Sequence, residues 1–194
     1  MWNIFAKQYA PKERVLFRFL RQSKLFEKLT DDELAEFVPF LNERKYIKNE
    51  AIFFRNDPSQ ALYIIKSGEI MLNLDVQDKF EELIIIQKGE SFGDNALIEG
   101  ARRNYNAICY SEVCELYVLP QVNILNIFEE DIEIKAKILQ AFAYYYDQYL
   151  SNVFKAYRDT FSFFDLSEAY LLAKRNMTRP NNDWKLILWD YTET

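Results

Sequence analysis

Residues 46–70 read YIKNEAIFFRNDPSQALYIIKSGEI, a series of short apolar runs separated by residues that favour turns. Asn49, Asn56, Pro58 and Gly68 fall between runs rich in Ile, Phe, Tyr and Leu. This pattern is typical of β-strands joined by tight turns, and strands at this spacing favour a sandwich, a barrel or a jelly roll. Continued along the chain, it predicts strands over residues 45–47, 51–54, 62–65, 69–74, 83–87, 106–110 and 115–119.

Helical periodicity flanks the strand region on both sides. Apolar residues recur at steps of three and four between residues 11 and 41, which predicts two or three short helices. Thr30 followed by Asp31, Asp32 and Glu33 is typical of a helix start, with a hydroxyl N-cap and a capping box. After Pro120, the pattern predicts a short helix over residues 121–128 and a long one over about 131–157.

The long helix carries apolar and aromatic residues at heptad spacing. A heptad stripe packs either against a second helix, as in a dimer, or against the helix's own β domain. The sequence favours neither arrangement. We call these positions the seam residues: Leu139, Phe142, Tyr146, Tyr149, Val153 and Ala156.

The predicted fold class is α+β: an antiparallel β-roll of the jelly-roll type with N-terminal helices, a long C-terminal helix and a small appended tail. The predicted divisions are a helical segment at 1–25, the β-roll at 26–130, the long helix at 131–158 and the tail at 159–194. Within the tail, the pattern predicts a helix over residues 166–176 and a strand over 184–189.

Composition excludes several classes of function. The chain has 194 residues, a formal net charge of −6 and no His. Imidazole catalysis, the Ser-His-Asp and Cys-His arrangements, and His-ligated zinc or haem are therefore excluded. No nucleophile and base stand at a recognisable spacing, so we predict no catalytic residue, no metal site and no enzymatic activity.

The two cysteines, Cys109 and Cys114, are too few for a disulfide framework or a four-ligand metal site, and we predict buried free thiols. The acidic balance argues against non-specific binding of nucleic acid. No apolar run approaches the ~20 residues that span a bilayer, and the first residues lack a signal-peptide pattern. The sequence therefore predicts a soluble, cytoplasmic protein.

The first 21 residues mix aromatic and apolar side chains with basic ones. Such a helix lies either on an acidic membrane surface or against the β domain with its bases in solvent, and the second arrangement is favoured. The residues concerned are Trp2, Ile4, Phe5, Tyr9 and Leu16, with Lys7, Lys12, Arg14, Arg18 and Arg21.

All four glycines lie in the strand region, and Gly93 and Gly100 bracket the segment FGDNALIEGARRN at residues 92–104. This segment offers a glycine turn, a run able to form one helical turn, a carboxylate near its start and paired Arg residues near its end. Backbone N–H groups and an Arg fork bind phosphate, and a carboxylate accepts hydrogen bonds from sugar hydroxyls. The combination suits a sugar-phosphate such as a nucleotide, although generic chemistry alone favours an ordinary surface turn.

Residues 46–70 and the stretch IIIQKGESFGDNALIEGARRNYNA at 84–107 resemble the cyclic nucleotide-binding domain of the catabolite activator protein (Crp/Fnr-like) family, also found in cyclic-nucleotide-dependent kinases and gated channels. The resemblance covers about residues 26–157. The phosphate-binding cassette of that family reads approximately F-G-E-x-A-L, followed by a short loop and an Arg. Here residues 92–97 read FGDNAL, which agrees with it except that Asp94 replaces the Glu, and Arg103 follows at the family's spacing.

The resemblance implies that Arg103 pairs with the cyclic phosphate of cyclic AMP or cyclic GMP, helped by backbone N–H groups around Ala96 and Leu97. Asp94 stands where the family has a Glu that accepts from the ribose 2′-hydroxyl, and it is one methylene shorter. A tyrosine of the long helix, Tyr145, Tyr146 or Tyr149, is implied to stack on the base. The implied ligand-binding residues are Phe92, Gly93, Asp94, Asn95, Ala96, Leu97, Arg102, Arg103 and Asn104.

Other positions depart from the family pattern. Asn104 replaces the usual Ser, Thr or Ala, while Asn49 and Asn56 occupy turns that are usually Gly and tolerate positive φ. The chain after Tyr157 is too short for a winged helix-turn-helix, and residues 161–194 carry four basic against five acidic residues, so DNA binding is not expected.

Two functions remain open. The first is a regulatory sensor in which ligand binding shifts the long helix and changes a homodimer or a contact with a regulatory protein partner. The second is a degenerate roll that no longer binds nucleotide and serves as an interaction scaffold. Asp94 and Asn104 favour the second function, whereas the retained Arg103 favours the first.

Overall fold

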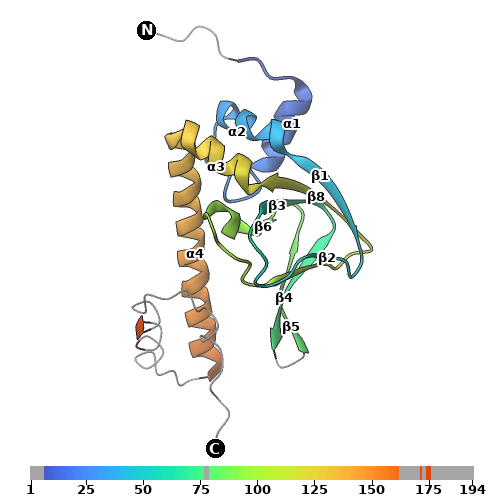
Figure 1. Cartoon of the computed structure of the whole chain (residues 1–194), viewed down its shortest axis with the longest axis vertical. Coiled ribbons are helices and arrows are strands. Elements are labelled where there is room, and N and C mark those ends of the chain that lie inside the picture. Colours follow the sequence, from blue (N-terminus) through green and yellow to red (C-terminus); the bar gives the residue numbers. More distant parts are fainter. Residues whose placement is uncertain (1–6, 77–78, 162–170, 172–173, 176–194) are drawn as a thin grey trace, which may run out of the picture. The chain divides into compact units, whose positions relative to one another are not determined.

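The structure is a computed structural model that describes residues 7–76, 79–161, 171 and 174–175 (Figure 1). The chain divides into two compact units, Met1–Asp147 and Gln148–Thr194. The first unit contains the sheets and most of the helices, so it contains the candidate site.

Short helices precede the sheets, as the sequence predicts. They are α1 (Pro11–Leu20), α2 (Asp31–Phe37) and the 3₁₀ helix η1 (Val38–Phe40). Thr30 caps α2 in the predicted capping box: its hydroxyl accepts from the Glu33 N–H at 3.3 Å, and the Glu33 carboxylate accepts from the Thr30 N–H at 2.8 Å. Phe17 and Leu20 of α1 are fully buried, so α1 packs on the unit, as the favoured interpretation expects.

Within the described residues, eight strands form two four-stranded antiparallel sheets, whose arrangement can be followed in Figure 1. One sheet has the order β1-β8-β3-β6 and the other β2-β7-β4-β5. Each of the seven predicted strands overlaps an observed one, and the predictions over 51–54 and 106–110 run one residue too far, which confirms the β-roll. The bounds are β1 (Asn42–Ile47), β2 (Ala51–Phe53), β3 (Ala61–Ser67), β4 (Glu69–Val76), β5 (Lys79–Gln87), β6 (Ser91–Phe92), β7 (Asn106–Cys109) and β8 (Val113–Pro120).

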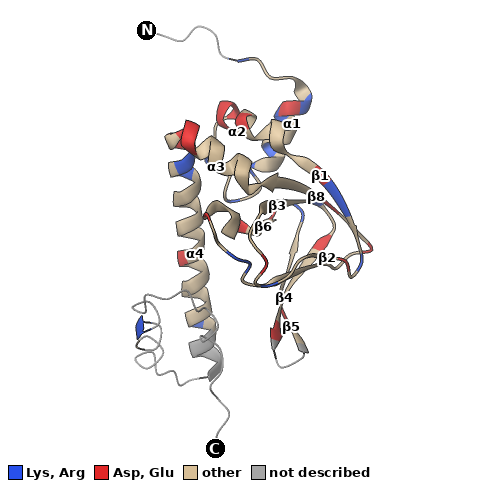
Figure 2. Cartoon of the chain, viewed as in Figure 1, with Lys and Arg blue, Asp and Glu red and all other residues tan. Residues whose placement is uncertain are grey.

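Two features of the strands escaped the sequence pattern. The strand β6 has only two residues, which is too short to show a period. The strand β5 begins four residues before the predicted one, because the exposed charged residues Glu81 and Glu82 interrupt its apolar pattern. Figure 2 shows basic residues along β1 and acidic ones on α2 and β5.

The turns between the strands use the predicted backbone chemistry. Asn49 and Asn56 have φ of 66° and 69° and are the non-glycine residues with positive φ in the described chain. Both occupy turns where the resembled family usually has Gly, so the substitution preserves the turn geometry. The predicted burial of Cys109 and Cys114 is also confirmed.

Two helices follow the sheets, α3 (Gln121–Glu130) and α4 (Ile132–Phe161), as predicted within a few residues. Leu139 and Phe142 pack against the core cluster formed by the N-terminal helices, α3 and the sheet. Tyr149 and Val153, by contrast, are 55% and 41% exposed. Two early seam residues therefore pack on the protein's own core, whereas Tyr149 and Val153 are exposed.

Some predictions lie beyond what the structure describes. The tail helix over 166–176 and the strand over 184–189 lie outside the described residues, apart from positions 171 and 174–175. The same holds for Trp2, Ile4 and Phe5. The division at residues 25, 130 and 158 stays a prediction. In the described part of the chain, none of the helices combines the length and apolar character required to cross a membrane.

Candidate anion-binding site

The 92–104 segment folds as its sequence indicates. β6 ends at Phe92, Gly93 turns the chain with φ of 73°, and Asp94–Leu97 form one turn of 3₁₀ helix, η2. A Cβ at Gly93 would lie 2.5 Å from Arg103 Nη1. Glycine is required there both for the left-handed backbone and for the close approach of the guanidinium.

Arg103 is enclosed, with 3% of its surface exposed. Its Nη1 donates to the Gly93 carbonyl at 2.8 Å and its Nη2 donates to the Ala61 carbonyl at 2.7 Å. Both acceptors are neutral. The Nε is buried and has no hydrogen-bond partner among the described residues. The side chain is therefore positioned by β3 and by the glycine turn without a carboxylate bonded to it.

Aromatic rings surround the Arg103 guanidinium. Its Cζ lies 4.1 Å from the centre of the Phe53 ring and 5.5 Å from that of Tyr63, which are cation–π distances. Tyr63 also stacks on Phe92 with 5.0 Å between ring centres, and Phe53 lies 5.8 Å from Tyr105. Burial lowers the pKa of Arg103, but a guanidinium pKa starts so high that the group stays charged at neutral pH.

Asp94 lies beside this guanidinium and is 9% exposed. Burial raises the pKa of its carboxyl, while the charge of Arg103 and the nearby hydroxyls of Tyr105 and Tyr146 act against that rise. The Tyr105 hydroxyl oxygen also accepts from the Gly93 N–H at 3.0 Å. The pKa of Asp94 is therefore affected by residues of the roll and of α4.

Buried polar atoms without partners gather in the same part of the fold. They are Ser59 Oγ, Asn95 Oδ1 and Arg103 Nε, counted over the described residues. The loop that holds Ser59 pairs with the end of the 92–104 segment, because the Ser59 N–H donates to the Ala101 carbonyl at 2.9 Å. Most buried polar atoms in folded proteins have a partner, so this grouping is typical of a site that takes a polar ligand.

The other predicted site residues lie in different surroundings. Phe92, Ala96 and Leu97 are buried, and the Ala96 N–H donates to the Gly93 carbonyl at 3.0 Å. Arg102 and Asn104 are exposed, and Arg102 Nη1 donates to the Asn56 carbonyl at 2.7 Å. The structure thus brings together Gly93, Asp94 and Arg103, and it does not bring Arg102 to them.

Sequence reasoning missed the aromatic residues that enclose Arg103. Phe53 and Tyr63 come from β2 and β3, about fifty and forty positions earlier, and no local spacing joins them to Arg103. Tyr105 follows Arg103 by two residues, and its position next to the segment is the one signal that was available. Tyr146 was one of the three tyrosines that the resemblance implied for stacking on the nucleotide base.

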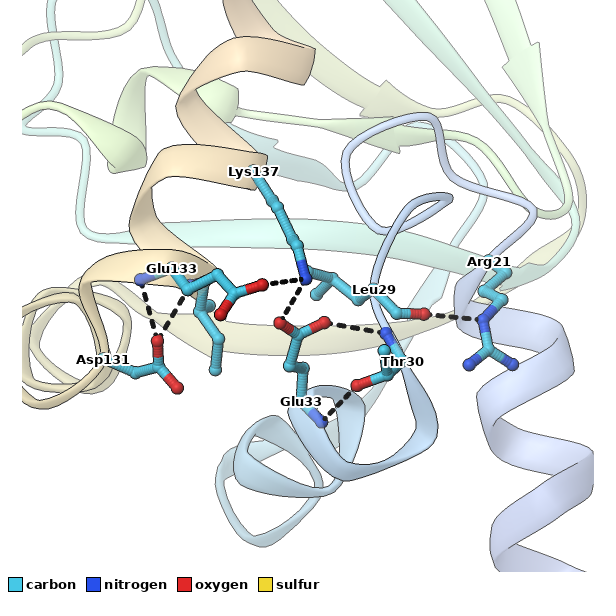
Figure 3. Close-up of polar contacts among 8 residues, drawn as sticks. Arg21, Leu29, Thr30, Glu33, Asp131, Glu133 and Lys137 are labelled. Carbon is cyan, nitrogen blue, oxygen red and sulfur yellow. Dashed lines mark hydrogen bonds and ion pairs between the residues drawn. The ribbon is translucent and has the colours of Figure 1, made fainter. Parts of the chain in front are cut away.

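A polar clamp fixes the start of α4 (Figure 3). Lys137 Nζ lies 2.6 Å from Glu33 Oε1 of α2 and 2.8 Å from Glu133 Oε1, and Asp131 accepts from the first N–H groups of α4. Burial by itself would raise the pKa of Glu33, but hydrogen bonds from Lys137 and Thr30 outweigh it and leave that pKa below its usual value. We call Glu33, Lys137 and Glu133 the α4 clamp.

Comparison with known proteins assigns the fold to a family. Residues 43–131 match the family model described as cyclic nucleotide-binding domain. The chain is 27% identical over 115 residues to the cyclic AMP receptor protein of Thermus thermophilus, covering 58% of this chain and 48% of that protein. It is 26% identical over 108 residues to human cGMP-dependent protein kinase 2, covering 55% of this chain and 14% of the kinase. The chain thus spans about half or less of the length of these relatives.

Solved structures show the same architecture. The regulatory domain of Toxoplasma gondii PKA, crystallised with cAMP, has a TM-score of 0.56 and 26% identity, covering 62% of this chain and 46% of that one. The Thermus thermophilus catabolite activator protein has a TM-score of 0.59 and 23% identity, covering 69% and 62%. The predicted jelly-roll fold is therefore confirmed.

Proposed function

Because residues 43–131 belong to the cyclic nucleotide-binding domain family, we propose that this protein is a non-enzymatic sensor that binds a cyclic nucleotide at Arg103. Binding is transmitted through α4 to a second copy of the chain or to a regulatory protein partner. The proposal includes a cytoplasmic location, where thiols such as Cys109 and Cys114 stay reduced.

The observation that carries this proposal is the buried, charged Arg103 whose bonded acceptors are neutral carbonyls. A buried cation costs free energy unless opposite charges are bonded to it, and Asp94 and Asp57 act on Arg103 from nearby without a hydrogen bond or ion pair to it. A cyclic phosphate supplies one negative charge and oxygen acceptors for the unpartnered Nε. Aromatic rings around the guanidinium keep water away and strengthen that interaction.

The sugar of the ligand is assigned to Asp94. A carboxylate accepts hydrogen bonds from hydroxyl groups, and Asp94 lies close enough to Arg103 for each to affect the other's pKa. A phosphate on Arg103 and a hydroxyl on Asp94 belong to one sugar-phosphate unit. The proposal therefore names cyclic AMP and cyclic GMP as the first ligands to test.

A second function is favoured by a different observation. Both terminal nitrogens of Arg103 are already bonded to carbonyls, and the Ala96 N–H is bonded to Gly93. A site in which backbone carbonyls already hold the guanidinium also suits a roll that has lost its ligand and acts as an interaction scaffold.

Calorimetric titration separates the two functions. The full chain is titrated with cyclic AMP, cyclic GMP, cyclic pyrimidine nucleotides and cyclic dinucleotides, and the melting temperature is measured in parallel. Saturable binding that raises the melting temperature supports the sensor, because a ligand that binds only the folded state stabilises it. A folded protein that binds none of these compounds supports the scaffold.

A further inference from the structure

The two cysteines of the chain lie side by side in the fold. Cys109 and Cys114 are fully buried free thiols, and their sulfur atoms are 2.7 Å apart. A disulfide bond is about 2.05 Å long, so the two sulfurs need to approach each other by less than ~1 Å to form one. The sequence contains no other cysteine with which either could pair.

The two cysteines belong to different sheets of the roll. Cys109 is the last residue of β7 and pairs with Ile70 of β4, whereas Cys114 lies in β8 and pairs with Tyr46 of β1. Residues 110–112 form the turn between β7 and β8. A bond between the two sulfurs would therefore join one sheet to the other at this turn.

The surrounding backbone leaves room for both sulfurs. The Cys114 thiol donates to the Glu69 carbonyl at 3.1 Å, and the Ser111 carbonyl lies 3.3 Å from the Cys109 sulfur. Gly68 has φ of 85°, and a Cβ at that position would lie 2.9 Å from the Cys114 sulfur. Glycine at this turn thus keeps open the space that the Cys114 sulfur occupies.

In the closed fold the cysteines are protected from reaction. Burial raises the pKa of Cys109, and the charge of Glu50 acts in the same direction. The thiolate is the form of cysteine that attacks an oxidant, so a buried neutral thiol reacts slowly. Oxidation of this pair therefore requires local opening of the β7–β8 turn. A disulfide that formed there would return to the core, where reductants would reach it slowly as well.

We propose that Cys109 and Cys114 are an oxidation site, at which hydrogen peroxide converts the two thiols into a disulfide that locks the two sheets together. In the first step, one thiol loses its proton and its sulfur attacks the peroxide. An S–O bond forms, the O–O bond breaks, and the displaced hydroxide takes up the proton and leaves as water.

The second step closes the disulfide. The sulfur of the other thiol attacks the sulfenic acid, an S–S bond forms, the S–O bond breaks, and a second water leaves with the remaining thiol proton. The two sulfurs together lose two electrons, which the peroxide gains. This inference is independent of nucleotide binding.

Mass spectrometry and thermal unfolding of the full chain test the proposal. The protein is treated with hydrogen peroxide and afterwards with dithiothreitol, and thiols are counted by maleimide labelling in denaturant. The variants Cys109→Ala and Cys114→Ala each retain a single thiol. They also retain all three methionines, so they report the oxidation of methionine without a disulfide.

We expect peroxide to remove two hydrogens and both maleimide-reactive thiols from the wild type, with the product remaining a single chain on a non-reducing gel. Its melting temperature should rise by roughly 4–8 °C, the range for a disulfide that closes a short loop in a chain of this size. Dithiothreitol should reverse both changes. Urea below the unfolding transition should speed the reaction severalfold, because it favours opening of the turn.

Three outcomes would overturn the proposal. One is two reactive thiols that persist after peroxide treatment in urea, which would make the cysteines only small apolar residues of the core. Another is oxidation to sulfinic acid or to a bond between two chains. The third is an equal change of melting temperature in the wild type and both variants. If the variants do not fold, the mass and thiol count of the wild type still decide the question.

Discussion

The guanidinium of Arg103 lies over the ring of Phe53, with 4.1 Å from Cζ to the ring centre. Phe53 ends β2, and Arg103 lies three residues before β7, the strand that pairs with β2. The pairing of β2 with β7 thus places the Phe53 ring against the face of the guanidinium. The Gly93 and Ala61 carbonyls accept hydrogen bonds from its terminal nitrogens. The cation is prepositioned, so a ligand anion would not have to order it.

Arg103→Ala is expected to abolish nucleotide binding and to lower the free energy of unfolding by about 1–3 kcal/mol. The stability loss follows because the change removes a buried side chain and its hydrogen bonds to the Gly93 and Ala61 carbonyls. Titration calorimetry gives the first result and urea unfolding the second.

Arg102→Ala is the matched control, because Arg102 is exposed and bonds only the Asn56 carbonyl at the surface. It is expected to bind nucleotide as the wild type does. If Arg102→Ala loses binding while Arg103→Ala keeps it, the assignment of the phosphate to Arg103 is wrong.

Gly93→Ala is expected to weaken nucleotide binding strongly and to destabilise the fold. Its new Cβ would lie 2.5 Å from Arg103 Nη1, so the guanidinium would have to move from its carbonyls. Gly100→Ala has nearly the same φ, +70° against +73°, but its Cβ meets nothing within 4 Å. The control variant therefore carries only backbone strain, of order 1 kcal/mol.

Melting temperatures and nucleotide affinities of the two glycine variants are compared directly. The expected order is a small loss of stability with intact binding for Gly100→Ala, and losses of both for Gly93→Ala. Equal effects of the two substitutions would mean that backbone strain, rather than contact with Arg103, explains the glycine at position 93.

Much of the fold follows from local sequence patterns. The apolar runs between Asn49, Asn56 and Gly68 mark strands because β-branched and aromatic residues suit a half-buried pleated surface. Thr30 and Glu33 mark a helix start because both side chains satisfy N–H groups that the helix leaves unbonded. These signals need only neighbouring residues, so one sequence is enough to find them.

The site was predictable only in part, because only some of its residues are neighbours in the sequence. Gly93, Asp94 and Arg103 lie within one segment, whereas Phe53 and Tyr63 reach Arg103 through pairing between strands far apart in the chain. The effect of Tyr146 on the pKa of Asp94 depends on how α4 packs on the roll. Long-range contacts of this kind leave no fixed spacing in the sequence.

Glu33→Gln is expected to lower the melting temperature at pH 7 by roughly 2–4 °C, the range for a loss of about 1 kcal/mol in a chain of this size. Hydrogen bonds from Lys137 and Thr30 hold the pKa of Glu33 below its usual value despite burial. A carboxyl whose pKa is lower in the folded state stabilises the protein above the unfolded-state pKa. That stability is lost as the pH falls through the folded-state pKa.

The stability difference between wild type and Glu33→Gln should therefore be full at neutral pH and shrink below pH ~4.3. Glu36→Gln on the same helix is the control, because Glu36 is exposed and pairs with Lys7 only at 3.9 Å. Thermal melts across pH 3 to 7 provide the comparison. A difference that stays constant to pH 3 would show that the charge of Glu33 contributes nothing to the α4 clamp.

Val153→Asp is expected to convert a dimer of the full chain into a monomer. Tyr149, Leu150, Val153 and Phe154 of α4 are each more than 40% exposed, and exposed apolar stripes at heptad spacing are typical of helix pairing. A carboxylate at Val153 would be desolvated in such an interface and would oppose association.

Light scattering should give about twice the 23.2 kDa chain mass for the wild type and a single chain mass for the variant. Ser151→Asp introduces the same charge at an exposed position outside the seam and should keep the dimer. If the wild type is a monomer, a second copy of the chain does not receive the signal. The proposed receiver would then be a regulatory protein partner.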